Sequence, residues 1–313
     1  MKKINVAIIY GGLSSESQIS KLTAQTIFDE LDKNKYNAQL LDLKKNFKKF
    51  LDLALKKKID IVIPAVHGWG GEDGRLQGLL DLIEIKYIFS PYYAHAVAMN
   101  KKLTKLVAGQ AGLNILPDIL IKKNELIVYK DIIRKLSFPI IVKPNNSGSS
   151  VGVKIAKNLA ELKTNIKYGF KFDKELILEK CIKGREFTMS IYGNKQPKVL
   201  PIIEIVPKVS SWFDYKAKYT EGGSEEICPA KISAAIAKSI REQGLKIFKA
   251  LGCKDLSRAD FIQDSRSGKI YFIEINTIPG MTKQSLFPKA LATQKITLKS
   301  YFDKVIRESL KNA

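Results

Sequence analysis

The chain has 313 residues, of which 45% are hydrophobic, enough for two or three packed domains. Its sequence has no apolar run of the roughly 18 residues that a membrane span needs and no signal-peptide pattern at its start, so we expect a cytoplasmic protein without membrane insertion. The formal net charge of +22 is almost all lysine spread from end to end, which is typical of a solvated surface and argues against a specific nucleic-acid partner.

The first part of the chain alternates between strand and helix patterns. Short apolar runs predict strands at 5–10, 38–43 and 59–66. Helical periodicity lies between them, at 18–31 and 47–55. This order predicts βαβ units, and therefore a parallel sheet with helices on its faces.

Two further regions follow this α/β region. The middle one begins with a helix near 99–111 and continues with strand-like runs at 115–121, 139–143, 151–155 and 175–181. The last one contains antiparallel-looking runs at 187–192 and 199–206, a polar loop at 207–224, a helix at 231–251 and a final hairpin. Both regions have the mixed pattern of α+β domains.

Two glycine-rich loops follow predicted strands of the first region, where α/β proteins bind ligands. The first loop contains Gly11, Gly12 and Glu16, whose carboxylate could hold an ammonium group or could simply start a helix. The second runs from His67 to Gly74 and combines four glycines with His, Glu and Asp. Turn chemistry alone does not explain such a set, so we expect a functional loop there.

A third loop begins with Lys143, at the end of a predicted strand, and continues as a Gly/Ser-rich segment to Gly152. Its amides and hydroxyls could close over phosphates while the lysine neutralises their charge. The segment does not have the P-loop pattern. The alternative is a hairpin turn with a lysine that reaches into solvent.

The final hairpin carries Asp260 on one strand and Glu274 with Asn276 on the next. Because alternate residues of a strand face the same side, their oxygens would converge, as in a magnesium site beside a nucleoside triphosphate. Arg258 lies on the same face and would add a cation where charge develops. The alternative is an ordinary hairpin with a polar solvent face.

These motifs together resemble the D-alanine:D-alanine ligases of the ATP-grasp superfamily, in matching order from Gly11 to Leu286. The segments 67–78 and 258–280 are the most specific part of the resemblance. It implies an N-terminal parallel α/β (pre-ATP-grasp) domain followed by a two-lobed α+β ATP-grasp domain. The implied boundaries are 1–97 for the N-terminal domain, 98–184 for the central lobe, and 185–313 for the C-terminal lobe, with a lid loop at 207–224.

The resemblance also implies an ATP site between the two lobes. Lys101 and Lys143 would contact phosphates, and Glu186 would contact the ribose. The strand edge of Glu179, Lys180 and Ile182 would bind adenine. The implied ligands of two Mg²⁺ (or Mn²⁺) ions are Asp260, Glu274 and Asn276.

The substrate site is implied in the same way. Glu16 would orient the ammonium of the first D-alanine, with His67 nearby, while Ser285 and Leu286 would receive the carboxylate of the second. Arg258 and the Gly280 amide would hold the oxyanion of the reaction. In the lid, the Lys218-Tyr219 pair would close the site, with Tyr219 bonded to Ser149, which in turn reaches Glu16.

The activity implied is the ATP-dependent joining of two D-alanines through an acyl phosphate, for peptidoglycan precursors, by an enzyme that is commonly a homodimer. Two alternatives remain at this point. One is a sister ligase that takes D-lactate or D-serine as the second substrate, and the other is a non-catalytic nucleotide-binding protein. Ser17 and Gln18 stand where many family members have charged or histidine residues, and they bear on substrate affinity rather than on the type of reaction.

Overall fold

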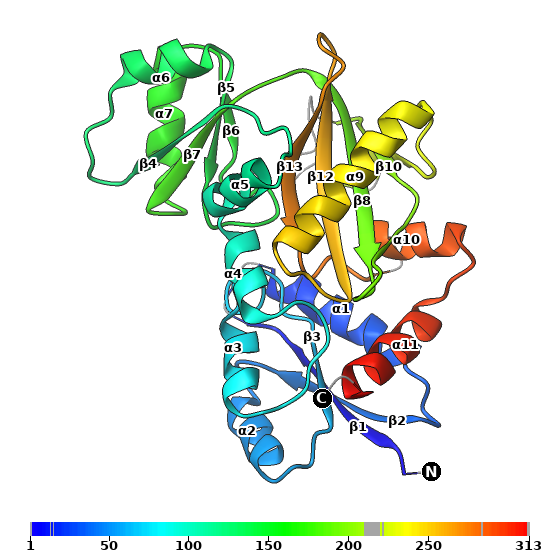
Figure 1. Cartoon of the computed structure of the whole chain (residues 1–313). Coiled ribbons are helices and arrows are strands. Elements are labelled where there is room, and N and C mark those ends of the chain that lie inside the picture. Colours follow the sequence, from blue (N-terminus) through cyan, green and yellow to red (C-terminus); the bar gives the residue numbers. More distant parts are fainter. Residues whose placement is uncertain are drawn as a thin grey trace.

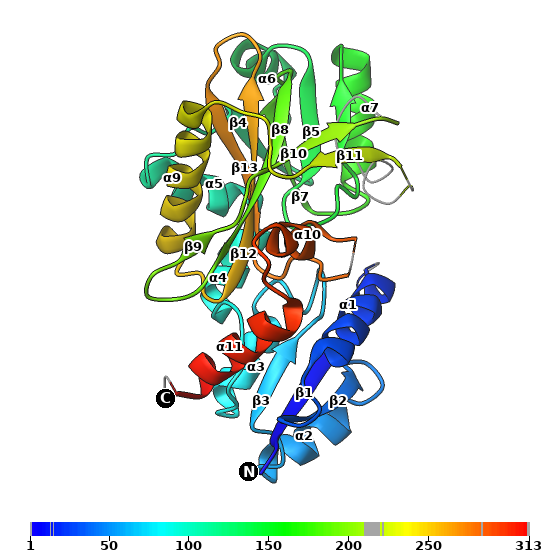
Figure 2. The same ribbon diagram turned by 90° about the vertical axis from the view of Figure 1, so that its right-hand side faces the viewer.

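The computed structural model describes residues 2–12, 14, 16–209, 220, 222–282 and 284–311. Within these residues the strands form three sheets, one for each region expected from the sequence. The N-terminal sheet lies at one end of the molecule, and the other two sheets lie side by side at the other end (Figures 1 and 2). No helix of the described residues is long and apolar enough to cross a membrane.

The N-terminal sheet is parallel, as predicted, with the strand order β2-β1-β3. Its strands are β1 (Ile4–Tyr10), β2 (Tyr36–Asp42) and β3 (Ile61–Pro64), and its helices are α1 (Ser17–Glu30), α2 (Phe47–Leu55), α3 (Arg75–Leu82) and α4 (Tyr92–Met99). Every residue of β3 is buried, because helices cover both faces of a parallel sheet. The loops after β1 and β3 therefore open at the same edge of the sheet.

The central sheet is antiparallel, with the order β4-β7-β5-β6. It contains β4 (Asp118–Lys122), β5 (Ile140–Pro144), β6 (Lys154–Ala156) and β7 (Glu175–Lys180), with the helices α5 (Lys101–Gln110), α6 (Tyr129–Leu136) and α7 (Leu159–Gly169). The sequence reading predicted α5 but not α6 or α7. These two helices become clear in the structure, where they bury Ile132, Leu136, Leu162 and Ile166 in one core with the sheet.

The third sheet has the order β11-β10-β8-β12-β13, and β9 pairs with β8. Its strands are β8 (Gly184–Tyr192), β9 (Lys198–Val199), β10 (Ile203–Pro207), β11 (Ser224–Ile227), β12 (Leu256–Asp264) and β13 (Ile270–Asn276), and α9 (Ala234–Ala250) packs on one face. The strand expected at 199–206 is divided into β9 and β10. Pro201 lies in the link, where it cannot donate a ladder hydrogen bond.

The last two helices, α10 (Leu286–Thr293) and α11 (Leu298–Lys311), return to the N-terminal sheet. Their Phe287, Phe302 and Ile306 share one core with Val6 and Ile8 of β1. Figure 2 shows α11 beside β3 and α1, near the start of the chain. The two ends of the chain therefore hold the N-terminal sheet and the third sheet together, whereas the domain boundaries stay a prediction.

Candidate active site

The hairpin of β12 and β13 brings four polar side chains to one face. Asp260 is directly opposite Glu274, and Arg258 is opposite Asn276. The Arg258 guanidinium donates from Nε and Nη2 to the two Asp260 oxygens, each at 3.0 Å. Thr188 on β8 donates to Asp260 Oδ1 at 2.6 Å, and Asn276 Nδ2 lies 3.4 Å from Asp260 Oδ2.

This face has donors that suit magnesium. Two carboxylates and a carboxamide oxygen are hard ligands, and the side chains of Asp260 and Glu274 keep 20% and 27% of their surface exposed. Within the described residues no group of three or more His, Cys, Asp or Glu could hold a metal, but here the third donor would be the amide of Asn276. The donor set therefore fits the expected cation.

Burial alone would lower the pKa of Arg258, but the charges of Asp260 and Glu274 outweigh burial and raise it. The guanidinium is therefore protonated at neutral pH. A permanent cation thus lies beside the acidic side chains of the hairpin.

Lys101 connects this face to the Gly/Ser loop. From the start of α5 its ammonium lies 3.7 Å from Glu274 Oε2 and donates to the backbone carbonyl of Ser147. Its backbone N–H donates to the carbonyl of Asn145 at 2.9 Å, which fixes the helix on the loop. The ammonium of Lys101, which we expect to contact the ATP phosphates, therefore lies between the Gly/Ser loop and the acidic hairpin.

Lys143 belongs to a second, buried charge cluster. Its Nζ donates to Glu179 Oε2 at 2.6 Å, and Lys105 Nζ donates to the other Glu179 oxygen and to the carbonyl of Leu116. Burial would raise the pKa of Glu179, but the charges of Lys143 and Lys105 outweigh it and lower the pKa. Lys105 also lies 3.4 Å from Asp118 Oδ2.

The sequence reading missed Lys105 and expected Glu179 at adenine. The only available signal for Lys105 was its spacing four residues after Lys101, on the same side of a helix. In the structure the carboxylate of Glu179 is buried against the lysines. Lys180 is exposed on the same strand edge, whereas Ile182 and Glu186 are half-buried.

Three loops meet where the first substrate is expected. Ser149, after β5, donates a hydrogen bond to Glu16 Oε1, and Ser14 donates to the carbonyl of His67 at 2.7 Å. Gly68 has φ +72°, and a Cβ there would lie 2.8 Å from Glu16 Oε2. Glycine is thus required for this close approach.

His67 lies beneath these loops rather than at an open surface. Its Nε2 is 2.9 Å from Thr23 Oγ1, and the backbone of Ile278 lies near the ring and acts to raise its pKa. Burial, together with the charge of Arg258, lowers its pKa to about 4, so the ring is neutral at pH 7. Neutral imidazole here can orient a loop but carries no charge for a substrate carboxylate.

Glu72 is a further member of the site to which the motif reading assigned no role. Its Oε2 accepts a hydrogen bond from the Gly68 backbone at 2.7 Å. Burial, followed by the charge of Glu16, raises the pKa of this carboxyl. Its position in the His67 to Gly74 loop was the sequence signal that could have identified it.

The segment before α10 presents the remaining predicted residues. Ser285 is the N-cap position of α10, and its hydroxyl lies 2.8 Å from that of Thr282. The side chain of Leu286 is buried in the core, so a ligand could reach only its backbone. A Cβ on Gly280 would lie 2.9 Å from Ser285 Oγ, which places the two residues side by side. Lys218 and Tyr219 of the predicted lid lie outside the described residues.

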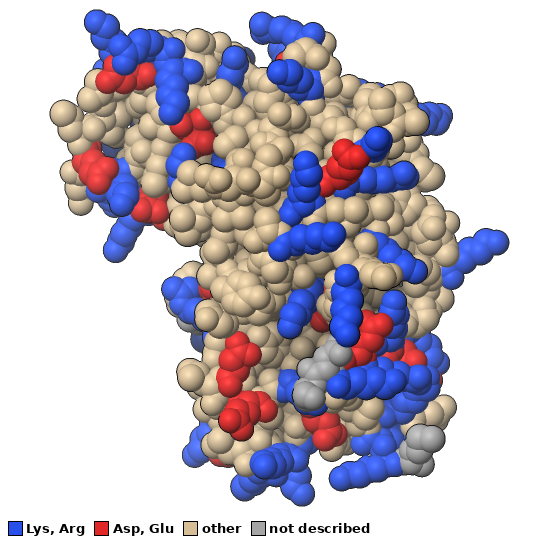
Figure 3. All heavy atoms as spheres, in the orientation of Figure 1, with Lys and Arg blue, Asp and Glu red and all other residues tan. Residues whose placement is uncertain are grey.

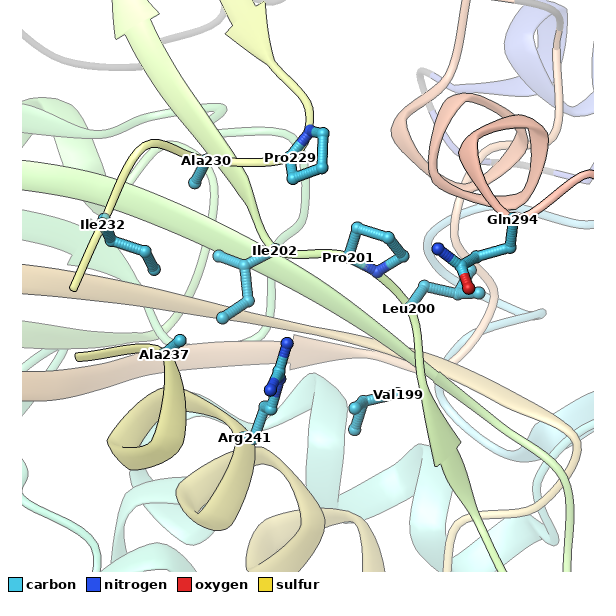
Figure 4. A pocket seen from close by; sticks show the side chains of 10 residues that line it. All are labelled: Val199, Leu200, Pro201, Ile202, Pro229, Ala230, Ile232, Ala237, Arg241 and Gln294. Atoms are coloured by element: carbon cyan, nitrogen blue, oxygen red, sulfur yellow. The ribbon is translucent and has the colours of Figure 1, made fainter. Parts of the chain in front are cut away.

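An apolar pocket of about 400 Å³ lies elsewhere, between the β9–β10 link, the segment before α9, and α9 itself (Figure 4). Its lining includes Ile202, Pro229 and Ala237, with Arg241 and Gln294 as its polar members. None of the predicted site residues lines it. The candidate site is the polar region where the three sheets meet, because there Ser149 contacts Glu16 and Lys101 contacts both Glu274 and Ser147.

Two antiparallel α+β lobes, with lysines on one and an acidic hairpin on the other, define the class of ATP-grasp ligases. Family models described as D-ala D-ala ligase C-terminus and D-ala D-ala ligase N-terminus match residues 107–307 and 43–90. The chain belongs to the D-alanine–D-alanine ligase family.

Individual relatives agree over nearly the whole length. The chain is 38% identical to the D-alanine–D-alanine ligase of Syntrophobacter fumaroxidans over 99% of both chains, and 38% identical to that of Carboxydothermus hydrogenoformans over 97% of both. The Bacillus anthracis ligase complexed with ATP has a TM-score of 0.85 and 32% identity, with 98% of each chain covered. The VanG D-Ala:D-Ser ligase of Enterococcus faecalis has a TM-score of 0.86 and 29% identity, with coverage of 98% of this chain and 100% of that one.

Proposed function

We propose that this protein joins two D-alanines to D-alanyl-D-alanine with ATP, through an acyl phosphate, for peptidoglycan precursors. One observation carries the proposal: the hairpin face places Arg258, Asp260, Glu274 and Asn276 together, and Lys101 links that face to the Gly/Ser loop. A protein that only binds nucleotide has no need of both an acidic cluster and a fixed cation beside it.

In the first step, the carboxylate of one D-alanine attacks the γ-phosphorus of ATP, and ADP leaves. Lys101 and Lys143 bind the phosphates, and the Gly/Ser loop supplies amides and hydroxyls. Asp260, Glu274 and Asn276 would hold two magnesium or manganese ions, which neutralise phosphate charge when bound. Glu186 and the strand edge at Lys180 and Ile182 receive the ribose and adenine.

In the second step, the amine of the other D-alanine attacks the acyl phosphate and phosphate leaves. Arg258 and the Gly280 amide stabilise the oxyanion. Glu16, held by Ser149, orients the ammonium of the first D-alanine. At the start of α10, the Ser285 hydroxyl and the Leu286 backbone N–H are offered to the carboxylate of the second, because the Ser285 N–H already donates to the carbonyl of Thr282 at 2.8 Å.

Water must be excluded, because it would hydrolyse the acyl phosphate. We assign this role to the lid at 207–224, with Lys218 and Tyr219 closing onto Ser149. The enzyme acts in the cytoplasm, where ATP is available, and works as a homodimer in the manner its family implies.

The test is an assay of phosphate release from ATP with magnesium, with and without D-alanine, combined with product identification. We expect release that depends on D-alanine and D-alanyl-D-alanine as the product. Phosphate release that does not require D-alanine would contradict the proposal. The absence of phosphate release with every substrate offered would also contradict it. Separating monomer from dimer by sedimentation tests the assembly.

A second candidate, a D-alanine–D-serine ligase, is kept because the VanG structure has the same TM-score of 0.86 as a Bacillus anthracis ligase structure, although its identity is 29% rather than 36%. The Lys218-Tyr219 pair favours a dipeptide over a depsipeptide product, and so D-alanine over D-lactate; it does not separate D-alanine from D-serine. Offering D-alanine with equimolar D-serine or D-lactate across pH decides between them. We expect D-alanyl-D-alanine to dominate near neutrality in the wild type, and Tyr219→Phe to let D-lactate compete at lower pH, where the D-alanine amine is more protonated.

A further inference from the structure

The chain contains only two histidines, His67 and His95, and both are buried. They come from different elements: His67 follows β3, and His95 lies in α4. They nevertheless face consecutive residues of one segment. The backbone of Ile278 lies near the His67 ring and acts to raise its pKa, and His95 lies 2.6 Å, through Nδ1, from Thr277 Oγ1.

The segment that they face lies between two proposed functional groups. Asn276 is the last residue of β13 and a proposed metal ligand, and Gly280 is the proposed oxyanion donor. Only Thr277, Ile278 and Pro279 separate them. Any rotation of this short stretch would move the Asn276 amide and the Gly280 N–H relative to each other.

The surroundings of His95 indicate that its imidazole does more than fill space in the core. The ring is fully buried, and Nε2 has no hydrogen-bond partner of normal geometry among the described residues. A buried polar atom without a partner is unfavourable, and an apolar side chain would fill the same space without that penalty. What the imidazole adds is the short hydrogen bond to Thr277, whose side chain is itself buried, together with an interaction with the backbone of Ser90 that acts to raise the ring's pKa.

The contact also crosses between elements. Residues 95 and 277 are 182 positions apart in the chain, and α4 packs directly against β13. In Figure 1, α4 lies at the junction between the N-terminal sheet and the third sheet. The hydrogen bond therefore ties the end of the acidic strand to the helix that precedes Lys101.

We propose that His95 is a positioning residue that acts through Thr277 to fix the segment from Asn276 to Gly280. The proposal rests on the proposed function, because that function gives Asn276 and Gly280 their roles. His95 touches no substrate. Its effect is to keep a cation ligand and an oxyanion donor at a set separation, which catalysis requires to within a fraction of an ångström.

Matched substitutions on both sides of the contact test this. Thr277→Val keeps the shape of the side chain and removes the hydroxyl, whereas Thr277→Ser keeps the hydroxyl. His95→Leu removes the ring nitrogen, whereas His95→Asn keeps a polar atom near the position of Nδ1. Each variant is measured for thermal unfolding, for magnesium-dependent ATP binding by calorimetry without D-alanine, and for kcat and KM.

We expect Thr277→Val and His95→Leu each to raise the magnesium concentration for half-maximal ATP binding about 10-fold, as outer residues of metal sites do. We also expect kcat to fall more than KM for D-alanine rises. Thr277→Ser and His95→Asn should retain most of the wild-type behaviour. The double variant His95→Leu/Thr277→Val should be no worse than either single variant, because both remove the same contact.

Unchanged magnesium dependence and kcat in both Thr277→Val and His95→Leu, with only a lower unfolding temperature, would overturn the proposal. If His95→Leu does not fold, the Thr277 pair alone decides. A wild-type protein without D-alanine-dependent phosphate release would instead refute the proposed function. The calorimetric series on magnesium and ATP still tests the positioning role in that case.

Discussion

The buried cluster around Glu179 and the hairpin face around Asp260 both combine lysine or arginine with carboxylates, but they differ in how their charges are compensated. In the buried cluster, the side chains of Lys105 and Glu179 are 2% and 1% exposed, and each carboxylate oxygen has its own lysine. On the hairpin face, Asp260 is partly exposed and shares its oxygens with Arg258 and Thr188.

This difference indicates that the buried cluster mainly stabilises the fold, whereas the hairpin face can bind ligands. The Glu179 carboxylate, whose two oxygens are each paired with a lysine, has little to offer a ligand, and these charges are costly to separate because water cannot replace a lost partner. A partly exposed set can exchange partners, so a phosphate or a cation can enter it. Lys143 belongs to the buried cluster, but it lies at the end of β5 beside the Gly/Ser loop, and so connects the two kinds of site.

The largest expected effect is on the buried cluster. Glu179→Gln would leave Lys105 and Lys143 buried without their carboxylate, so the free energy of unfolding should fall by about 3–5 kcal/mol. Urea unfolding measures it. The control is Glu242→Gln on α9, whose exposed pair with Lys238 should contribute about 1 kcal/mol or less. An equal loss of unfolding free energy in the two variants would show that the buried cluster contributes no more to stability than an exposed ion pair.

The open face should respond in the opposite way. Glu274→Gln removes a ligand charge at nearly constant volume, so turnover should fall by about 100-fold or more while the unfolding free energy changes little. Steady-state phosphate release in saturating magnesium measures it, with the exposed Glu242→Gln as the control. Wild-type turnover in saturating magnesium would refute the role assigned to Glu274.

The buried histidines should make stability depend on pH. Burial lowers the pKa of His67 to about 4 and of His95 to about 3, so between those values and about 6.5 the unfolded chain binds more protons. Each ring therefore removes about 1.4 kcal/mol of stability per pH unit as pH falls through this window. The free energy of unfolding of His95→Asn, relative to that of the wild type, should therefore increase by about 1.4 kcal/mol for each pH unit below pH 6.5.

Asp255 provides the opposite slope. Burial raises its pKa to about 6 although Phe89 N–H and Asn194 donate to its carboxylate. The folded state then holds a proton that the unfolded state has lost, so stability falls as pH rises from about 4 to 6. Urea unfolding at several pH values should show slopes of opposite sign for the two variants His95→Asn and Asp255→Asn. Parallel curves would contradict the assigned burial effects.

The smallest effect is expected for nucleic acid. On the face shown in Figure 3, lysine and arginine side chains are scattered among acidic and neutral residues rather than gathered in one stripe. Binding to duplex DNA should be weak, independent of sequence, and lost steeply as salt rises. Fluorescence anisotropy at several salt concentrations measures it. Tight, sequence-selective binding at physiological salt would overturn this expectation.

The sequence by itself determined features that depend on local pattern. Alternating strands and helices predicted the parallel sheet of β1, β2 and β3, and the period of two along β12 and β13 predicted that Arg258, Asp260, Glu274 and Asn276 share a face. These predictions hold because neighbouring residues in a strand or helix have a fixed relative direction, whatever the rest of the chain does.

Only the tertiary structure decided which charged side chains are buried in ion pairs and which remain accessible to ligands. Lys105 and Glu179 are 74 residues apart and His95 and Thr277 are 182 apart, so no local pattern pairs them. The packing of α10 and α11 against the first sheet could not be predicted from the sequence either. An amphipathic pattern shows that a helix has a buried face, but it does not show which element covers that face. Burial sets the pKa of a side chain and its access to ligands, and burial exists only once distant segments have packed together.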